Sequence, residues 1–300
     1  MTIAVIIASY QRAEDLRRCL KALGPQLEPG DQLITVTRPA DKESRDMLNS
    51  LDVPVTSVDV LVPGVIHAEN AGLAASWSDL VAFIDDDGVA PPDWLARIRT
   101  HFTQGMDLGA VCGPVLPVID GEVLRRPTGV WGRVLWHGCH IGNTDRIPER
   151  LTECDIVRGC NMAFRRKLIA RFDTRLLGYW RFEDDAALTV KAQNYRVICD
   201  PELAVLHYLA PIRVEFSRSV SPQDAYCLNH NNTYVLGKHF SVLRRIAFVI
   251  YTFAIGDEQS LGIVRLLSRL AQRRDRESVQ FAVASLAGKI AGLRSLWMWA

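Results

Sequence analysis

The chain has 300 residues, 48% of them hydrophobic, and a formal net charge of +1 at pH 7. This length allows one large core or two modest ones, and the near-neutral charge gives no general case for nucleic acid as a partner. Seven scattered cysteines without a CxxC pair fit reduced thiols, and the N-terminus lacks the charged leader of a signal peptide, so we expect a cytoplasmic protein.

The first hundred residues alternate between strand-like and helix-like segments, as expected of βαβ units. Short apolar runs predict strands, and apolar residues at helical spacing predict helices. In chain order we predict strands over 3–8, 33–37, 53–58 and 80–84, and helices over 13–23, around 44–51 and from 69 to 75. The loops after Ala8, Val36 and Ile84 should then meet in one cleft at the same edge of the sheet.

Three acids, Asp85, Asp86 and Asp87, directly follow the predicted strand 80–84. Ligands bind outside the carboxyl ends of strands in open α/β sheets. Carboxylates crowded at such a place repel one another unless a cation joins them, and their oxygens suit Mg²⁺ or Mn²⁺ held together with substrate phosphates. The triplet therefore predicts a metal–diphosphate site. The alternative is that the acids only cap a helix or form a turn.

The middle of the chain carries a second acid cluster. We predict a strand over 155–164 with small and polar residues at its centre, and a helix over 186–193 that directly follows Glu183, Asp184 and Asp185. A short strand over 195–199, a turn at 200–202 and the apolar stretch before His207 come next. The second cluster either moves a proton while the first holds a metal, or it only complements the helix dipole.

Residues 1–210 resemble the inverting glycosyltransferases of family 2, which have the GT-A fold. Five motifs in family-like order carry the resemblance: 8–12 (ASYQR), Gly64 with 67–73 (HAENAGL), 83–87 (FIDDD) with 91–95 (PPDWL), 158–166 (RGCNMAFRR), and Glu183-Asp184. The resemblance implies an α/β, Rossmann-like nucleotide-diphospho-sugar transferase fold. Its donor-binding half would span about 1–110 and its acceptor half about 111–210, and residues 211–300 would form a helical C-terminal extension.

The resemblance also implies a site. Asp87 would ligate Mn²⁺ or Mg²⁺ directly, Asp85 would face the ribose or the metal's water shell, and His207 would lie near the metal and the diphosphate. Most lone histidines are structural, and that alternative stays open for His207. The donor-binding residues would be Ala8, Ser9, Tyr10, Arg12, Arg38, Asp41, Asn70, Asp85 and Asp86. The acceptor would contact Gly159, Asn161 and Trp180.

The donor's base is not assigned by the sequence. Arg38 stands about where the family commonly carries an acid that helps read the nucleobase. A guanidinium cannot accept a hydrogen bond from a base. Asp41 is the neighbouring acid that would reach in its place, so a uracil-containing donor is not assumed.

The resemblance implies direct displacement at the anomeric carbon by an acceptor hydroxyl. That hydroxyl is a poor nucleophile, and a carboxylate that accepts its proton accelerates such a step by roughly 10²–10⁴-fold. Asp184 is our candidate base, with Asp185 as the open alternative. Glu183 would orient the acceptor or the helix.

The segment 115–148 reads as an excursion over the active site. Trp131 and Trp136 would stack on sugars or pack as core residues. His137 and His140 form an HxxH pair, which would suit zinc only on a helix and with further ligands that the sequence does not supply.

The last sixty residues differ in character, with nine Lys and Arg against four acids. The apolar run 246–255 is too short to cross a bilayer, and 260–270 and 281–299 repeat apolar residues at helical spacing. Such basic helices, ending in Trp297 and Trp299, would lie on the cytoplasmic face of an anionic membrane, where a lipid-linked acceptor is found. Alternatively they pack on the catalytic domain or form a homo-oligomer.

The leading functional hypothesis is a metal-dependent inverting glycosyltransferase in surface polysaccharide or glycolipid assembly. It would move a sugar from a nucleotide-diphospho-sugar donor to a saccharide or lipid-linked saccharide. A nucleotidyl- or phosphoryl-transfer enzyme is one alternative, although the chain has no GxxxxGK[ST] loop. A non-catalytic sugar-binding relative is the other.

Overall fold

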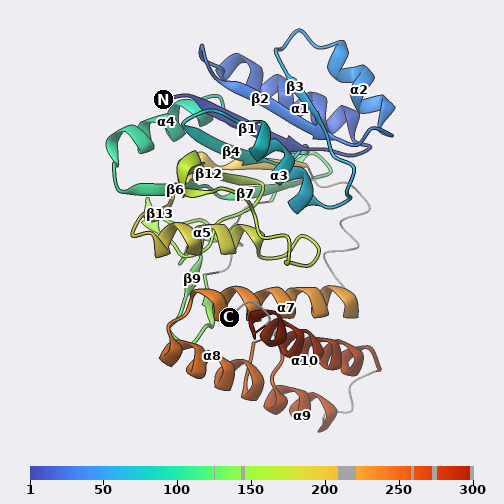
Figure 1. Cartoon of the computed structure of the whole chain (residues 1–300), viewed down its shortest axis with the longest axis vertical. Helices are drawn as coiled ribbons and strands as arrows, with labels where there is room; N and C mark the ends of the chain where they lie inside the picture. The colour runs from blue at the N-terminus through green and yellow to red at the C-terminus, as the bar shows by residue number, and fades with distance from the viewer. Residues whose placement is uncertain (125, 143–145, 209–220, 258–259, 272–275, 298–300) are drawn as a thin grey trace. The chain divides into compact units, whose positions relative to one another are not determined.

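The computed structural model describes residues 1–124, 126–142, 146–208, 221–257, 260–271 and 276–297 (Figure 1). The chain divides into two compact units, which are described separately. The first unit comprises Met1–Gly132, Gly142–Phe172 and Ala186–Leu209, and the second comprises Arg133–Ile141, Asp173–Asp185 and Ala210–Ala300. The expected domain boundary near residue 210 remains a prediction.

An eight-stranded sheet forms the centre of the first unit, in the order β11-β13-β6-β12-β4-β1-β2-β3. β4 pairs with β1 in parallel, β1 with β2, and β2 with β3, which confirms the predicted βαβ arrangement. The strands are β1 Ile3–Ala8, β2 Gln32–Thr37, β3 Thr56–Asp59, β4 Leu80–Ile84, β6 Leu108–Cys112, β11 Thr152–Glu153, β12 Asn161–Arg165 and β13 Arg196–Cys199.

Helices connect these strands at nearly the predicted positions. They are α1 Ala13–Leu23, α2 Lys42–Asn49, α3 Val65–Ala75, α4 Trp94–Gln104 and α5 Phe182–Ala192. α1 buries Leu16, Leu20 and Leu23 on one face, as its apolar spacing predicts. α3 begins four residues before the predicted start and lies against β1 at Gly72, where a Cβ atom would stand 2.4 Å from Cγ2 of Ile6. A larger residue at this position would push the helix away from the sheet.

A smaller sheet crosses the end of β4. It has the order β5-β14-β7-β8 and consists of β5 Gly88–Val89, β7 Val115–Ile119, β8 Glu122–Val123 and β14 Val205–Tyr208. β14 runs antiparallel to β5, and His207 stands opposite Gly88 in the register. The chain after residue 200 therefore returns to the residue that follows the acid triplet.

The strand predicted over 155–164 is wrong in its first half. β12 begins only at Asn161, and residues 158–161 form a tight turn in which the Asn161 N–H donates to the Arg158 carbonyl at 2.9 Å. Gly159 lies within this turn, where glycine is favoured because it has no side chain, and not in a flat strand. The turn places Cys160 directly before the paired part of β12.

Three aromatic and histidine predictions in the excursion can be compared with the structure. Trp131 is a buried core residue of the first unit, whereas Trp136, in the second, is largely exposed. His137 and His140 lie in and beside the hairpin of β9 Arg133–Val134 and β10 His140–Ile141, and not on a helix. The helical spacing that an HxxH zinc pair would need is therefore absent here.

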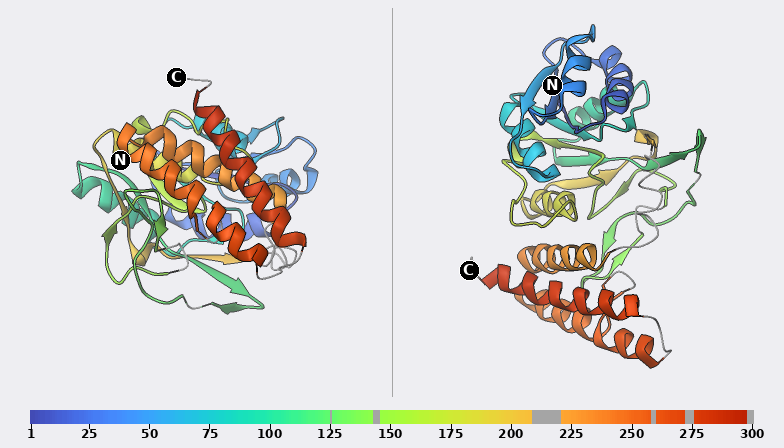
Figure 2. Two further views of the ribbon diagram at one scale, coloured as in Figure 1. Left: turned by 90° about the horizontal axis from the view of Figure 1, so that it is seen from below. Right: turned by 90° about the vertical axis from the view of Figure 1, so that its right-hand side faces the viewer.

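Helices build most of the second unit (Figures 1 and 2). They are α7 Pro222–His239, α8 Val242–Ala254, α9 Ile263–Ala271 and α10 Arg276–Trp297. The Ser221 side chain caps α7 with Asp224 in a capping box. α10 packs closely on α7 because Gly288 and Gly292 carry no side chain; added Cβ atoms would lie 2.3 and 2.4 Å from the carbonyls of Tyr226 and His230.

The predicted C-terminal helices over 260–270 and 281–299 are confirmed where the structure describes them. Trp297 is exposed near the end of α10, and Trp299 lies outside the described residues. Within the described ranges, no helix combines the length and the apolar character needed to cross a membrane.

Candidate functional site

The acid triplet is tied to the loop after β1. β1 and β4 are parallel neighbours, so Ser9, Arg12 and the triplet emerge at the same edge of the sheet. The Ser9 hydroxyl donates to Asp86 at 2.8 Å. Arg12 donates to Asp86 and to Asp87, each at 2.8 Å. The predicted meeting of these loops is confirmed, and Arg12 joins two of the three carboxylates.

His207 reaches the triplet from the smaller sheet. Its place opposite Gly88, together with the hydrogen bond from the Tyr208 N–H to the Asp87 carbonyl at 2.9 Å, fixes β14 beside the acids. Nε2 of His207 lies 2.7 Å from Oδ1 of Asp87 and 3.5 Å from Oδ2 of Asp85. Burial lowers the pKa of His207, but these two carboxylates outweigh it and raise the pKa to about 9.

The carboxylates differ in their electrostatics. Burial raises the pKa of Asp86 to about 7, against the opposing effect of Arg12. Burial would also raise the pKa of Asp87, but the hydrogen bond and charge of His207, and then Arg12, lower it below its usual range. Asp87 is fully buried, and the Asp85 side chain is 37% exposed. Asp85 is therefore the member of the triplet that faces solvent.

Three side chains that could ligate a metal ion come together at this place. Ligand atoms of Asp85, Cys160 and His207 all lie within 4.8 Å of one another, the one such cluster of three in the described chain. β12 runs antiparallel to β4 with Asn161 opposite Ile84, which brings Cys160 beside Asp85. Carboxylate oxygens suit Mg²⁺ and Mn²⁺, whereas imidazole suits transition-metal ions and a thiol favours softer ions. The residues fit a divalent cation.

Sequence reasoning did not single out Cys160, although it named the residues on either side. The β12–β4 pairing that brings it to Asp85 joins segments about eighty residues apart. No local spacing signals such a contact.

The residues predicted to bind the donor lie in two groups. Ala8 ends β1 opposite Val36, and beyond it the Arg38 guanidinium lies over the Tyr10 ring, 4.9 Å from its centroid. These two side chains lie just beyond the ends of β1 and β2. Asp41, by contrast, is buried and accepts backbone N–H groups from Gln11 at 2.6 Å and Ser44 at 3.2 Å.

Two predicted amides hold the fold together. The Asn70 side chain donates to the Phe172 carbonyl at 3.0 Å and accepts from its N–H at 2.7 Å. Asn161 accepts from the Trp94 indole at 3.0 Å and donates to the carbonyls of Pro114 and Leu203 at 3.0 and 2.7 Å. Beside Asn70, buried Glu69 has a pKa well above its ordinary range because of burial and the charge of Asp85.

The second acid cluster begins α5, and its two aspartates have different partners within the second unit. Arg181 pairs with Asp184 at 2.8 Å. Asp185 pairs with two basic side chains at the end of α7, through Nζ of Lys238 at 2.8 Å and Nε2 of His239 at 2.7 Å. Both aspartates are buried, and Glu183 is half-buried. Asp185 thus joins α5 to α7, whereas Asp184 pairs with its own loop.

α7 also holds the loop that leads to these acids. The Asn231 side chain accepts from the Leu177 N–H at 2.9 Å and donates to the carbonyls of Leu177 and Trp180 at 2.8 and 2.7 Å. Tyr234 donates to Asp173 at 2.9 Å. Trp180 stacks on Tyr179 with ring centroids 4.5 Å apart. Sequence reasoning missed Asn231, Lys238 and His239, since their role depends on a contact between α7 and a loop about fifty residues earlier.

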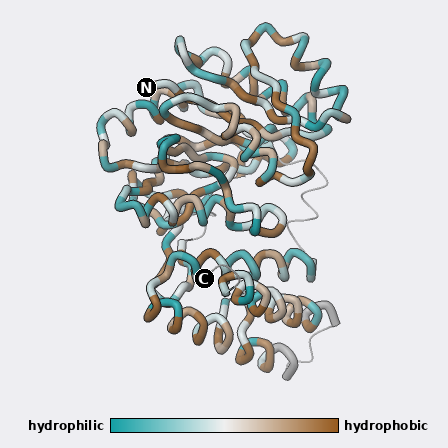
Figure 3. The backbone as a smooth tube through the Cα atoms, viewed as in Figure 1, coloured by the Kyte–Doolittle hydropathy of each residue, from teal (hydrophilic) through white to brown (hydrophobic). Residues whose placement is uncertain are grey.

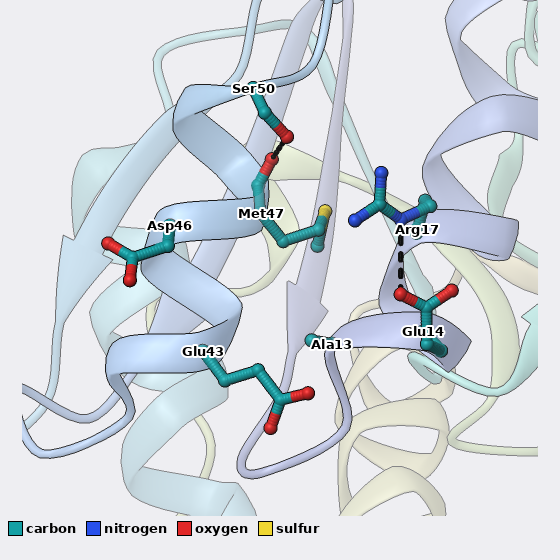
Figure 4. Close-up of a pocket in the computed structure, with 7 residues that line it drawn as sticks. All are labelled: Ala13, Glu14, Arg17, Glu43, Asp46, Met47 and Ser50. Carbon is teal, nitrogen blue, oxygen red and sulfur yellow. Dashed lines mark hydrogen bonds and ion pairs between the residues drawn. The ribbon is translucent and has the colours of Figure 1, made fainter.

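A shallow pocket elsewhere on the first unit is lined by both charged and apolar residues (Figure 4). It lies between α1 and α2, and Glu14, Glu43, Asp46 and Arg17 are among the residues that line it. Arg17 pairs with Glu14 at 3.4 Å. None of the predicted site residues lines this pocket, so it serves below as a source of control variants.

The mixed sheet, with acids at the end of its central strand β4, has the arrangement of the GT-A fold. Solved structures agree: *Staphylococcus aureus* TarS 1–349 in complex with UDP-GlcNAc superposes with a TM-score of 0.64 at 12% identity, over 99% of this chain and 84% of that one. The mannosyltransferase PcManGT from Pyrobaculum calidifontis, in complex with GDP-Man and Mn²⁺, gives 0.58 at 16% identity, over 99% and 88%.

Sequence comparison names the family. The model of glycosyl transferase family 2 matches residues 4–172, more than half of the chain. The chain therefore belongs to this family and is a glycosyltransferase. A glucosyl-dolichyl phosphate glucuronosyltransferase of Haloferax volcanii is 25% identical over 72% of each chain. An uncharacterized glycosyltransferase of Nostoc sp. is 32% identical over 41% of this chain and 38% of its own length. The phosphoryl-transfer alternative is not favoured.

Proposed function

We propose that the end of β4 binds a nucleotide-diphospho-sugar together with Mn²⁺ or Mg²⁺. The convergence of Asp85, Asp87, Cys160 and His207 from three separate strands and turns is the observation that carries the proposal. One relative of the same fold was solved with GDP-Man and Mn²⁺ and another with UDP-GlcNAc, which supports the donor class but leaves the base open.

In this proposal Asp87, Asp85 and His207 hold the cation, with Cys160 beside them. A bound divalent cation would neutralise the negative charge that develops on the departing nucleoside diphosphate. Ser9 and Arg12 fix the two inner carboxylates, and Tyr10 with Arg38 would contact the nucleobase. The remaining predicted donor-side residues are Asp86, Asp41 and Asn70. In this proposal each acts by holding the loops around the donor in place.

We infer that Asp184 is the general base. A base must accept the acceptor's proton, and Asp185 is already paired with Lys238 and His239 of α7. Asp184 pairs with Arg181 of its own loop. Glu183, Gly159, Asn161 and Trp180 remain the predicted acceptor side. With this assignment, the acceptor oxygen bonds to the anomeric carbon, its proton passes to Asp184, and the nucleoside diphosphate leaves.

The acceptor in this proposal is a lipid-linked saccharide on the cytoplasmic face of a membrane. The *Haloferax* relative bears the name of an enzyme that acts on glucosyl-dolichyl phosphate, and it aligns over 72% of this chain. A saccharide without a lipid is the coarser alternative. A homo-oligomer is compatible with either.

The test measures donor binding by calorimetry, using uridine-, guanosine- and thymidine-diphosphate sugars with and without Mn²⁺. We expect one nucleotide to bind in a metal-dependent way to the wild type. Replacing Asp85 or Asp87 with alanine should abolish that dependence, because each removes a proposed oxygen ligand. Asp46→Ala, which removes an exposed acid of the Figure 4 pocket, is the matched control and should bind as the wild type does.

Metal-independent binding, or equal loss in the Asp46 control, would overturn the metal assignment. Donor binding without transfer or hydrolysis under any condition would favour the non-catalytic alternative.

A further inference from the structure

α8 presents an apolar face to solvent. Val242, Leu243, Ile246 and Ile250 recur at the spacing of one helix face, and each is between 54% and 76% exposed. The opposite face holds the buried residues Phe248 and Thr252. A helix that buries one side and exposes large apolar residues on the other has an unpartnered hydrophobic surface.

α9 repeats this arrangement. Ile263, Val264 and Leu267 lie on one face and are between 50% and 60% exposed. Figure 3 shows hydrophobic positions recurring along both helices. These seven residues of α8 and α9 are called the apolar face below.

The turn between the two helices is held in place. The Gly262 N–H donates to the Ile255 carbonyl at 3.1 Å, and the Asp257 N–H donates to the Ser260 carbonyl at 2.9 Å. Buried Lys289 of α10 donates to the carbonyls of Thr252, Ser260 and Leu261 at 2.5, 3.1 and 2.8 Å. α8 and α9 are therefore anchored to α10 and present their exposed residues from a prepared scaffold.

The charged residues in the sequences of α8 and α9 are all basic. Neither the α8 sequence nor the α9 sequence contains an acid, and Asp257 lies in the turn between the two helices. Arg245 is exposed on α8 just outside the arc of its apolar residues, whereas Arg265 is exposed on the side of α9 away from its apolar residues. Apolar residues on one side of a helix and a basic residue at its margin are the pattern of helices that lie in the interface of an anionic bilayer.

We propose that the apolar face of α8 and α9 lies in the surface of an anionic membrane, with Arg245 beside the lipid headgroups. The proposal rests on the proposed function in one respect, since a lipid-linked acceptor is found at such a surface. The binding surface itself is separate from every residue of the donor site.

Vesicle co-sedimentation of the full chain tests the proposal. The probes are vesicles of phosphatidylcholine alone and of equal parts phosphatidylcholine and phosphatidylglycerol, at low and high salt. We expect binding to the anionic vesicles that weakens with salt. Leu243→Glu combined with Leu267→Glu should weaken it by about tenfold or more, because charges enter the buried face. Arg245→Gln should reduce the preference for anionic lipid.

Met106→Glu is the matched control, since Met106 is 78% exposed in the first unit. It should bind vesicles as the wild type does, and circular dichroism should show all variants folded. Equal binding by the Leu243/Leu267 variant would overturn the proposal. The proposal would also be overturned if the wild type did not bind vesicles and light scattering showed a dimer for the wild type but a monomer for the Leu243/Leu267 variant. A second copy of the chain would then cover the face.

Donor binding with Mn²⁺ is measured on the same samples. Vesicle binding without donor binding would contradict the proposed function and support the proposed membrane surface. Donor binding without vesicle binding would support the proposed function and contradict the membrane surface.

Discussion

Asp184 and Asp185 are neighbours in the chain, yet their surroundings suit them to different roles. Asp185 pairs with Lys238 and His239 of α7, whereas Asp184 pairs with Arg181, three residues before it. A buried carboxylate that joins two elements is a structural link, because removing it takes a partner from the charge of Lys238. We therefore keep Asp184 as the proposed proton acceptor.

Exchange to asparagine separates these roles. Asp184→Asn should lower kcat by roughly 10²–10⁴-fold with donor affinity and melting temperature near those of the wild type. Asp185→Asn should lower the free energy of unfolding by about 1–3 kcal/mol, because Lys238 and His239 lose their charged partner. Turnover and thermal unfolding of both variants provide the check. Normal turnover in Asp184→Asn would assign the base elsewhere.

Cys160 makes a prediction about metal preference. Thiolates favour soft ions, and carboxylate and imidazole alone do not. The wild type should bind Cd²⁺ more tightly than Mn²⁺ and should show a sulfur-to-metal absorption band with Co²⁺. Cys160→Ser should remove the band and most of the Cd²⁺ preference while Mn²⁺ binding changes little. Cys227→Ser, in the second unit, is the control, and a band retained in Cys160→Ser would mean that the thiol does not ligate.

At the scale of elements, α7 supports loop 173–185, which carries Asp184. Asn231 makes three hydrogen bonds to residues 177 and 180, and it is fully buried. Loss of such bonds leaves backbone groups unpaired. Loop 173–185 therefore takes its shape from a helix that follows it by about fifty residues.

Asn231→Ala should lower kcat and raise KM for the acceptor, because the loop carrying Trp180 and Asp184 loses its anchor. KM for the donor should stay near the wild-type value. Asn229→Ala removes an equally buried amide of α7, one that donates to Ala225 of the same helix at 2.8 Å. This control should affect stability more than KM for the acceptor. An equal rise of KM for the acceptor in both variants would mean a general weakening of α7.

Lys289 makes the stability of the helical unit depend on pH. Burial lowers its pKa from 10.5 to about 8, and the charge of Asp257 opposes this only in part. Between these two values the unfolded chain holds more protons than the folded one, so stability should rise with pH from about 8 to 10.5 and stay level below that window. Each pKa unit corresponds to about 1.4 kcal/mol.

Denaturant unfolding at several alkaline pH values measures this dependence. Lys289→Gln keeps an N–H donor for the carbonyls but cannot titrate, so its stability should rise less over the window than that of the wild type. Identical pH profiles would show that Lys289 holds its proton in both states.

The elements that local pattern decides were predictable from the sequence. Apolar runs placed β1 and β4, and apolar spacing placed α1, because each signal lies within one segment. The meeting of Ser9, Arg12 and the acids followed from parallel strands alone. Cys160 and Asn231 did not follow, since pairing of β12 with β4 and packing of α7 on loop 173–185 join segments far apart in the chain. The tight turn at residue 158 also defeated the prediction of one long strand.

At the scale of the whole molecule, the predicted donor residues all belong to the first unit, whereas Trp180, Glu183, Asp184 and Asp185 belong to the second. Metal and donor should therefore stabilise the first unit, whereas adding the acceptor should also affect residues of the second. A ligand that binds only the folded state adds stability that grows with its concentration, about 2.7 kcal/mol at a hundred times Kd. That stabilisation is greatest where the contacts are made.

Hydrogen exchange of the full chain should resolve this division. With Mn²⁺ and the nucleoside diphosphate, exchange should slow in segments 9–12, 85–89, 158–161 and 205–208, because these lie around the proposed cation. Residues 176–185 should slow only when an acceptor analogue is added as well. Segment 38–46 runs from Arg38 into α2, where Glu43 and Asp46 line the Figure 4 pocket, and it serves as a graded control. Protection should be present at Arg38 and absent by Asp46. Protection of 176–185 by metal and nucleotide alone would show that the donor already orders the acceptor side, and the two substrates would then bind in a fixed order.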